Sequence, residues 1–165
     1  MRLVFFISLF FSLLMPSGAS AIAEAPGWLG PPKKAPVALC QAIMMTGIRM
    51  GVKDPKLSLA IAWVESSYRN VVSDDGQDLG YFQINRHTAT IYGMDQTLLM
   101  QNIIYQAAGH FIILQDKLKH CAHLKQDAFS CYHSTTPKHR IPYAERVKKA
   151  YKQIPSFAEA CYGVD

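Results

Sequence analysis

The alternation of hydrophobic and polar positions predicts a chain built mainly of helices. Apolar residues recur at helical spacing over residues 36–50, and they form an almost unbroken run over residues 57–64. The second run has clear signals for a helix start, because Asp54 suits the N-cap and Pro55 suits the first helical position. We therefore predict one helix over residues 36–50 and a second helix that begins at Pro55 and ends at Glu65.

The pattern changes after Glu65. Turn-forming residues break the helical spacing up to residue 77, and residues 80–85 have the pattern of a short strand or extended segment. Helical spacing then returns in four segments, at residues 86–92, 98–118, 127–132 and 142–153. The expected fold class is mainly α, with a very small extended or β element in the loop region that follows Glu65.

The first 21 residues have the pattern of a secretory signal peptide. Arg2 supplies a positive start, an apolar stretch follows, and Ala19, Ser20 and Ala21 form a small-residue cleavage site. We expect an exported protein, periplasmic or secreted, that is cut near Ala21. A retained signal anchor is the alternative.

Cleavage would leave about 140 residues, which is enough for one domain with a single hydrophobic core. A Pro-rich linker or strap at residues 22–35 precedes this domain at residues 36–154, and residues 155–165 form a tail. The formal charge falls from +5 to +4 when Arg2 is removed. The basic residues are dispersed and match no nucleic-acid-binding pattern, so we expect no nucleic acid; a mild positive surface suits an anionic polymer such as a cell wall, or serves solubility alone.

Four cysteines lie in the predicted mature chain, and an even number in an exported protein indicates two disulfides. Three connectivities are open. We favour Cys121 with Cys131, which closes a short loop, and Cys40 with Cys161, which ties the first helix to the tail. A metal site is the competing interpretation, since two of these cysteines lie near three histidines, His120, His123 and His133, but the spacing matches no paired-ligand signature.

The most informative single residue is Glu65, a carboxylate at the end of an apolar helix. It shares a helical face with Ile61 and Ala62, one turn earlier. Burial against such side chains disfavours the charged form and raises the pKa of a carboxyl group. Glu65 would then keep a proton near neutral pH, as a general acid for a poor leaving group requires. The alternative is a helix-end residue that points into water.

Three blocks of the sequence resemble the lytic transglycosylases with a lysozyme-like fold. Glu65-Ser66 stands at a helix end, residues 80–85 read Gly-Tyr-Phe-Gln-Ile-Asn where the family has Gly-Leu-Met-Gln-Ile, and residues 131–133 read Cys-Tyr-His where it has Ala-Tyr-Asn. Tyr143 and Val147 in the last helix add to the likeness, which covers about residues 39–151. The chain is most similar to the small exported members that accompany type IV secretion and conjugation systems. His133 departs from the family's asparagine and would add a titrating group near the substrate.

The resemblance implies cleavage of the β-1,4 bond between N-acetylmuramic acid and N-acetylglucosamine in peptidoglycan, with no cofactor and no metal. Glu65 would protonate the glycosidic oxygen and then take a proton from the C6 hydroxyl of the same sugar, which closes a 1,6-anhydro ring. The expected partners are the glycan strands and the secretion or conjugation machinery for which the cell wall is opened.

The resemblance also implies roles for other side chains. Gln83 would contact the substrate or orient its loop, Tyr132 would line the cleft, and Tyr143 would hydrogen-bond near the Glu65 carboxyl. Ser66 would hold the local geometry, and Ser73 is a candidate sugar contact. Each could instead be structural: Gln83 a satisfied core amide, and the two tyrosines core aromatics.

Two other functions remain open at this point. Asp78 stands two residues before Gly80, where animal lysozymes have their second carboxylate relative to this block, so a hydrolytic lysozyme is the first alternative. Asp78 would stabilise the cation, bind sugar or only shape the turn. The second alternative is a module that binds glycan or a secretion subunit without cleaving it, although such a module has no use for a carboxyl group in an apolar environment.

The signal-peptide interpretation predicts the mass of the exported protein. After export, intact-mass measurement should give a chain that lacks residues 1–21. A mass that still includes this segment would instead identify a retained anchor.

Overall fold

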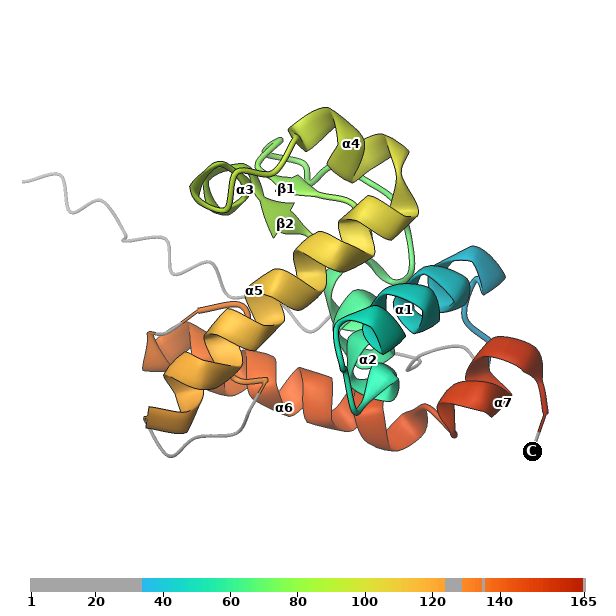
Figure 1. Ribbon diagram of the computed structural model, residues 1–165. Helices are drawn as coiled ribbons and strands as arrows, with labels where there is room; N and C mark the ends of the chain where they lie inside the picture. Colours follow the sequence, from blue (N-terminus) through green and yellow to red (C-terminus); the bar gives the residue numbers. More distant parts are fainter. Residues whose placement is uncertain (1–33, 124–128, 135, 165) are drawn as a thin grey trace, which may run out of the picture.

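The computed structural model describes residues 34–123, 129–134 and 136–164 (Figure 1). The predicted signal peptide and most of the Pro-rich segment at 22–35 lie outside these residues. The described part is mainly helical with one small sheet, and no helix in it is long and apolar enough to cross a membrane. Its elements are α1 (Val37–Arg49), α2 (Pro55–Ser66), β1 (Asp78–Leu79), β2 (Ile84–Asn85), α3 (Arg86–Ile91), α4 (Gln96–Gln101), α5 (Ile103–His123), α6 (Pro137–Gln153) and α7 (Phe157–Tyr162).

The first three predicted helices are confirmed as α1, α2 and α3, with ends within one residue of those expected. The start of α2 follows its sequence signals, because the Asp54 side chain accepts a hydrogen bond from the Leu57 backbone N–H at 3.2 Å and Pro55 is the first helical residue. The side chains of Leu59, Ile61 and Ala62 are fully buried. The apolar run therefore places α2 in the core.

The single extended segment predicted at residues 80–85 is wrong in its limits. The structure has a hairpin instead, in which Asp78 pairs with Asn85 and Leu79 with Ile84. Residues 80–83 form the turn between the two short strands. The turn replaces the predicted strand because Gly80 and Gln83 both have positive φ, which a strand does not allow.

The long helix predicted at residues 98–118 is two helices. Asn102 interrupts it with an extended backbone, and its side chain accepts hydrogen bonds from the N–H groups of Ile104 and Tyr105, both at 3.0 Å. Asn102 is thus the N-cap of α5, a role for which asparagine is strongly preferred. The periodicity alone did not separate α4 from α5, because apolar residues continue through the break.

The last two predicted helices also need correction. Residues 129–132 of the segment predicted as a helix form turns, and its other residues lie outside the described part. Helix α6 begins at Pro137, not at Pro142, which lies inside it. Both prolines suit a helix start, but Pro137 occupies the first turn, where no backbone donor is needed. Helix α7 lies within the segment that the sequence described only as a tail.

Two helix pairs, α1 with α5 and α2 with α6, pack against each other more extensively than any other pair of elements in the described part. Figure 1 shows the hairpin, α3 and α4 gathered on one side of α5, with α4 at its N-terminal end, while α6 crosses the other end of the molecule and leads to α7. The favoured disulfide pairing is confirmed: Cys40 is bonded to Cys161, and Cys121 to Cys131, with Cα separations of 5.7 and 5.9 Å. The first bond fixes α7 to α1, and the Ala35 N–H donates to the Ala160 carbonyl beside it at 2.8 Å.

The hairpin turn rests on a buried glutamine. Gln106 of α5 is fully buried, and its side-chain oxygen accepts a hydrogen bond from the Tyr81 N–H at 2.7 Å. Its amide nitrogen donates to the Leu99 carbonyl and to the Asn70 side chain. A Cβ atom on Gly80, whose φ is +77°, would overlap the Gln106 amide. Glycine is therefore required at Gly80 for both its backbone angle and its size.

The effect of the backbone angle at Gly80 can be separated from the effect of its size by comparison with Gly76, which has nearly the same φ. Gly80→Ala should lower the free energy of unfolding by about 2–4 kcal/mol, since it adds a steric clash to the cost of positive φ. Gly76, at φ +75°, has nothing within 4 Å of the place that a Cβ atom would occupy, and Gly76→Ala should cost only about 1–2 kcal/mol. Urea unfolding of both variants measures the difference. Equal losses would contradict the close contact with Gln106.

Candidate active site

Glu65 lies in the last turn of α2 and is only partly exposed. Burial raises the pKa of its carboxyl from 4.5 to about 7. Three neighbours act more weakly: a hydrogen bond from Tyr143 and the positive charge of Arg146 lower the pKa, and the negative charge of Asp78 raises it. Half of such groups carry a proton near neutral pH, and the residue as a whole is not fully buried. Both properties suit a group that exchanges protons with a bound molecule.

Tyr143 and Arg146 come from one face of α6, three residues apart. The Tyr143 side chain is buried, and its hydroxyl is close enough to Glu65 to lower the carboxyl's pKa. The hydroxyl nevertheless makes no full hydrogen bond to any described residue. Hydrogen bonds to a charged acceptor are shorter and stronger than bonds to a neutral one. The contact between the Tyr143 hydroxyl and the carboxyl should therefore become a full hydrogen bond when Glu65 ionises. The Arg146 guanidinium lies 6.0 Å from the centre of the Tyr143 ring.

Ser66 fixes the end of α2 against the hairpin turn. Its hydroxyl oxygen lies 2.8 Å from the Tyr81 carbonyl and 3.0 Å from the Ala62 carbonyl, and it accepts a hydrogen bond from the Arg69 N–H at 3.2 Å. The chain then turns sharply, because Ser67 and Tyr68 both have positive φ. This geometry agrees with the expected role of Ser66 in holding the backbone next to Glu65.

Gln83 fixes the turn at residues 80–83 through hydrogen bonds from its side-chain amide. Its side-chain amide donates to the Val71 carbonyl at 3.0 Å and to the Gly80 carbonyl at 2.8 Å. Both donors are therefore used in orienting the loop, one of the two roles expected for this residue. Ser67, Tyr68 and Gln83 are the non-glycine residues with positive φ in the described part of the chain, and all three adjoin Glu65 or this turn. Strained backbone of this kind concentrates at functional sites.

Asp78 and Ser73 belong to the loop that leads into β1. The Asp78 carboxylate accepts a hydrogen bond from the Asn85 amide at 2.9 Å, and its charge is the weakest of the named influences on Glu65. The Ser73 hydroxyl donates to Asp75 at 2.6 Å and accepts from the Asp78 N–H at 2.8 Å. Ser73 thus closes a turn, whereas Asp78 reaches the neighbourhood of Glu65.

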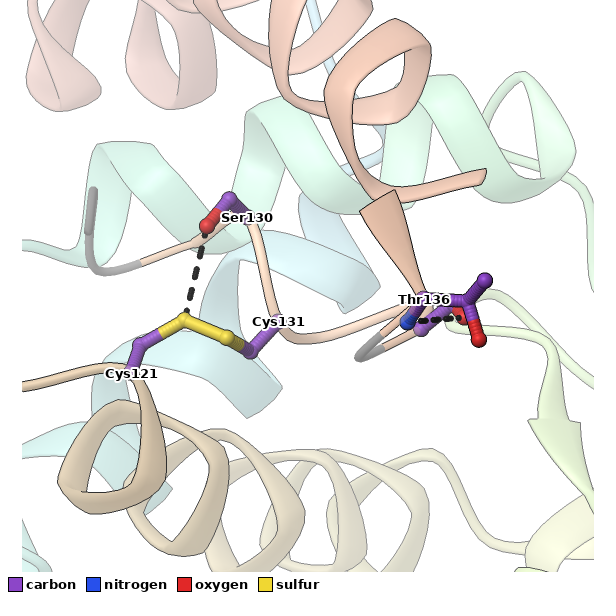
Figure 2. Close-up of a disulfide and its surroundings, with 5 residues drawn as sticks. Cys121, Ser130, Cys131 and Thr136 are labelled. Carbon is purple, nitrogen blue, oxygen red and sulfur yellow. Dashed lines mark hydrogen bonds between the residues drawn. A yellow bond between two sulfur atoms is a disulfide. The ribbon is translucent and has the colours of Figure 1, made fainter. Parts of the chain in front are cut away.

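Tyr132 reaches the same place from the segment between α5 and α6. Its hydroxyl lies 3.0 Å from Nδ1 of His110 and 3.4 Å from the Phe82 carbonyl. Burial, and then the charge of Glu65, raise the pKa of its hydroxyl. The adjacent Cys131 is bonded to Cys121 near the end of α5, and Figure 2 shows the Ser130 hydroxyl beside the Cys121 sulfur, at 3.4 Å. This disulfide anchors the short segment that carries Tyr132.

His133 is exposed, and its ring stacks on the ring of Tyr143, with centroids 5.0 Å apart and planes 14° apart. It therefore lies at the edge of the site, as expected for a residue that follows Tyr132. The interpretation as a metal site loses two ligands, because Cys121 and Cys131 are joined in a disulfide. Among the described residues, no group of three or more His, Cys, Asp or Glu side chains could hold a metal ion.

Two members of this site were not predicted from the sequence. Arg146 could have been found from its spacing to Tyr143, since both residues lie in the helix predicted at residues 142–153. His110 fell on the apolar stripe of α5 and gave no separate signal. Comparison with known proteins adds no further candidate, since no known protein family, no curated protein and no solved structure matches this chain.

The raised pKa of Glu65 predicts how stability depends on pH. Below about pH 4.5 the carboxyl is protonated in both the folded and the unfolded chain, so it costs nothing there. Above about pH 7 it is ionised in both, and the folded state carries the full cost of burying the charge. Relative to the wild type, Glu65→Gln should therefore gain about 3 kcal/mol of unfolding free energy between these pH values.

Urea unfolding from pH 4 to pH 8 measures this gain, with Glu145→Gln as the control. Glu145 is an exposed residue of α6, 3.3 Å from Lys148, and its replacement should give a nearly constant difference. A Glu65→Gln variant that is less stable at every pH would mark Glu65 as a structural residue.

Proposed function

We propose that this chain is an exported lytic transglycosylase with a lysozyme-like fold, which cleaves the glycan strands of peptidoglycan. The observation that carries the proposal is the carboxyl of Glu65, which is partly buried at the end of an apolar helix and has a pKa of about 7. The motifs that resemble this family supply the residues around it: Ser66, the turn at residues 80–83, Tyr132 and Tyr143.

The fold is compatible with this proposal. A mainly helical domain with a small hairpin beside the proposed acid is what the resemblance implies, and the two disulfides suit a protein exported to an oxidising compartment. We further propose that the enzyme opens the cell wall locally for a secretion or conjugation apparatus, which rests on the resemblance alone.

The first chemical step is proton transfer to the leaving group. Protonated Glu65 gives its proton to the glycosidic oxygen, the bond from this oxygen to C1 of the muramoyl sugar breaks, and positive charge develops at C1. Glu65 becomes a carboxylate in a partly buried place. Tyr143 and Arg146 offset that cost, because both lower the pKa of Glu65 and so favour its ionised form.

The second step returns the proton to Glu65. The carboxylate takes the proton of the C6 hydroxyl on the same sugar, the C6 oxygen bonds to C1, and a 1,6-anhydro ring closes. Because the nucleophile is tethered to the reacting sugar, it has a high effective concentration and needs no positioned water. Glu65 is protonated again and ready for the next bond.

Asp78 distinguishes this reaction from lysozyme-type hydrolysis. A lysozyme-type hydrolase usually employs a second carboxylate that acts on C1 or on a water molecule. One oxygen of Asp78 is engaged by Asn85, and the aspartate acts only weakly on Glu65. These observations favour a structural and electrostatic role for Asp78, and therefore a mechanism with a single carboxylate.

Digestion of purified peptidoglycan, with mass analysis of the released fragments, tests the proposed function. Wild-type protein should release fragments with 1,6-anhydro ends, and the rate should fall as the pH rises through about 7, where Glu65 loses its proton. Glu65→Gln should lower the rate by at least about 100-fold, and Asp78→Asn by less than about 10-fold.

The exposed Glu145→Gln serves again as the matched control and should retain the wild-type rate. Fragments with hydrated reducing ends, together with an Asp78→Asn variant as inactive as Glu65→Gln, would identify a hydrolase. Glycan binding by the wild type without release of any fragment would identify a binding module.

A further inference from the structure

Three buried polar side chains from three parts of the fold form one hydrogen-bonded chain behind Glu65. Ser58 of α2 and His110 of α5 are fully buried, and Tyr132 is nearly so. The Ser58 hydroxyl lies 3.0 Å from Nε2 of His110, and the Tyr132 hydroxyl lies 3.0 Å from Nδ1. Ser58 also precedes Glu65 by seven residues, two helical turns, and so lies on the same face of α2.

The His110 ring is held in one orientation and one charge state. It stacks on the ring of Phe82, with centroids 4.0 Å apart and planes 10° apart. The ring of Tyr132 packs against it edge to face, with centroids 5.2 Å apart. Burial lowers its pKa to about 3, so the imidazole is neutral under ordinary conditions. A neutral imidazole has one N–H donor and one bare nitrogen acceptor.

The contacts of the Tyr132 hydroxyl bear on which nitrogen of His110 carries the proton. The 3.0 Å contact with Nδ1 admits either tautomer, whereas in the 3.4 Å contact with the Phe82 carbonyl the Tyr132 hydroxyl is the donor, because a carbonyl can only accept. Both contacts are hydrogen bonds at once when the Tyr132 proton lies on the carbonyl. That proton is then not available to His110, and Nδ1 must be the donor to the Tyr132 oxygen. Nε2 is bare and accepts from the Ser58 hydroxyl. All donors point the same way: Ser58 to His110, His110 to Tyr132, and Tyr132 to Phe82.

We propose that Ser58 and His110 are positioning residues, which keep the hydroxyl proton of Tyr132 on the Phe82 carbonyl and away from the carboxyl of Glu65. The charge of Glu65 acts on the Tyr132 hydroxyl, but only the Tyr143 hydroxyl, which faces the carboxyl without a full bond, lowers the pKa of Glu65 as a donor. Without His110, only the long contact to Phe82 would hold the Tyr132 hydroxyl, and a bond to ionised Glu65 would be stronger. The chain thus protects the acidic form of Glu65; only its catalytic consequence rests on the proposed function.

Two nearly isosteric variants test the proposal. His110→Asn keeps a donor in place of Nδ1, whereas His110→Leu has a similar shape and no donor. In the wild type and in His110→Asn, carboxyl NMR should give Glu65 a pKa of about 7. In His110→Leu the freed Tyr132 hydroxyl should donate to the carboxylate and lower this pKa to about 6. Nitrogen NMR of labelled wild-type histidine should show His110 protonated at Nδ1 and bare at Nε2.

These readouts do not require activity, so they remain decisive if peptidoglycan is not cleaved. If it is cleaved, the pH at which the rate begins to fall should move down with the pKa in His110→Leu and stay in place in His110→Asn. A proton on Nε2 of the wild-type His110 would overturn the proposal. So would equal Glu65 pKa values in the two variants, which would leave His110 a packing residue. Thr46→Val, which removes a buried hydroxyl without a described partner, is the control for general destabilisation.

Discussion

The site depends on one constraint, the placement of an ionisable carboxyl at the end of a buried apolar helix. The buried side chains of Leu59, Ile61 and Ala62 hold helix α2 in the core. Glu65 lies in the last turn of this helix, where the core ends. Burial raises the carboxyl's pKa, while the residue as a whole stays partly exposed. Burying the ionised carboxyl lowers the stability of the folded state, and the same burial keeps a proton on Glu65 near neutral pH.

The surrounding structure maintains this carboxyl. The side chains of Ser66 and Gln83 hydrogen-bond to backbone carbonyls of the hairpin turn. The Gln106 side chain accepts a hydrogen bond from the Tyr81 N–H in the same turn. The two tyrosines differ in their action: Tyr143 donates toward Glu65, whereas Tyr132 is engaged by His110 and Phe82. Two hydroxyl donors therefore lie near the Glu65 carboxyl. The Tyr143 hydroxyl faces it, and the Tyr132 hydroxyl is bonded elsewhere.

The sequence predicted what depends on local signals and missed what depends on distant contacts. Helix α2 was placed correctly because Asp54 and Pro55 mark its start, and Glu65 followed from the apolar run. The break at Asn102 was missed because its cap interrupts no hydrophobic pattern. His110 has the spacing of a core residue and shows its polar role only through Ser58 and Tyr132, which are 52 and 22 residues away.

In the proposed reaction, Glu65 acts without a second carboxylate or an attacking water. Digesting peptidoglycan in water enriched in a heavy oxygen isotope tests it most directly. We expect the new muramoyl C1 end to contain no oxygen from the solvent, because the C6 oxygen of the same sugar closes the ring. One heavy oxygen atom at this C1 end would show that water attacks C1, and would contradict the proposal.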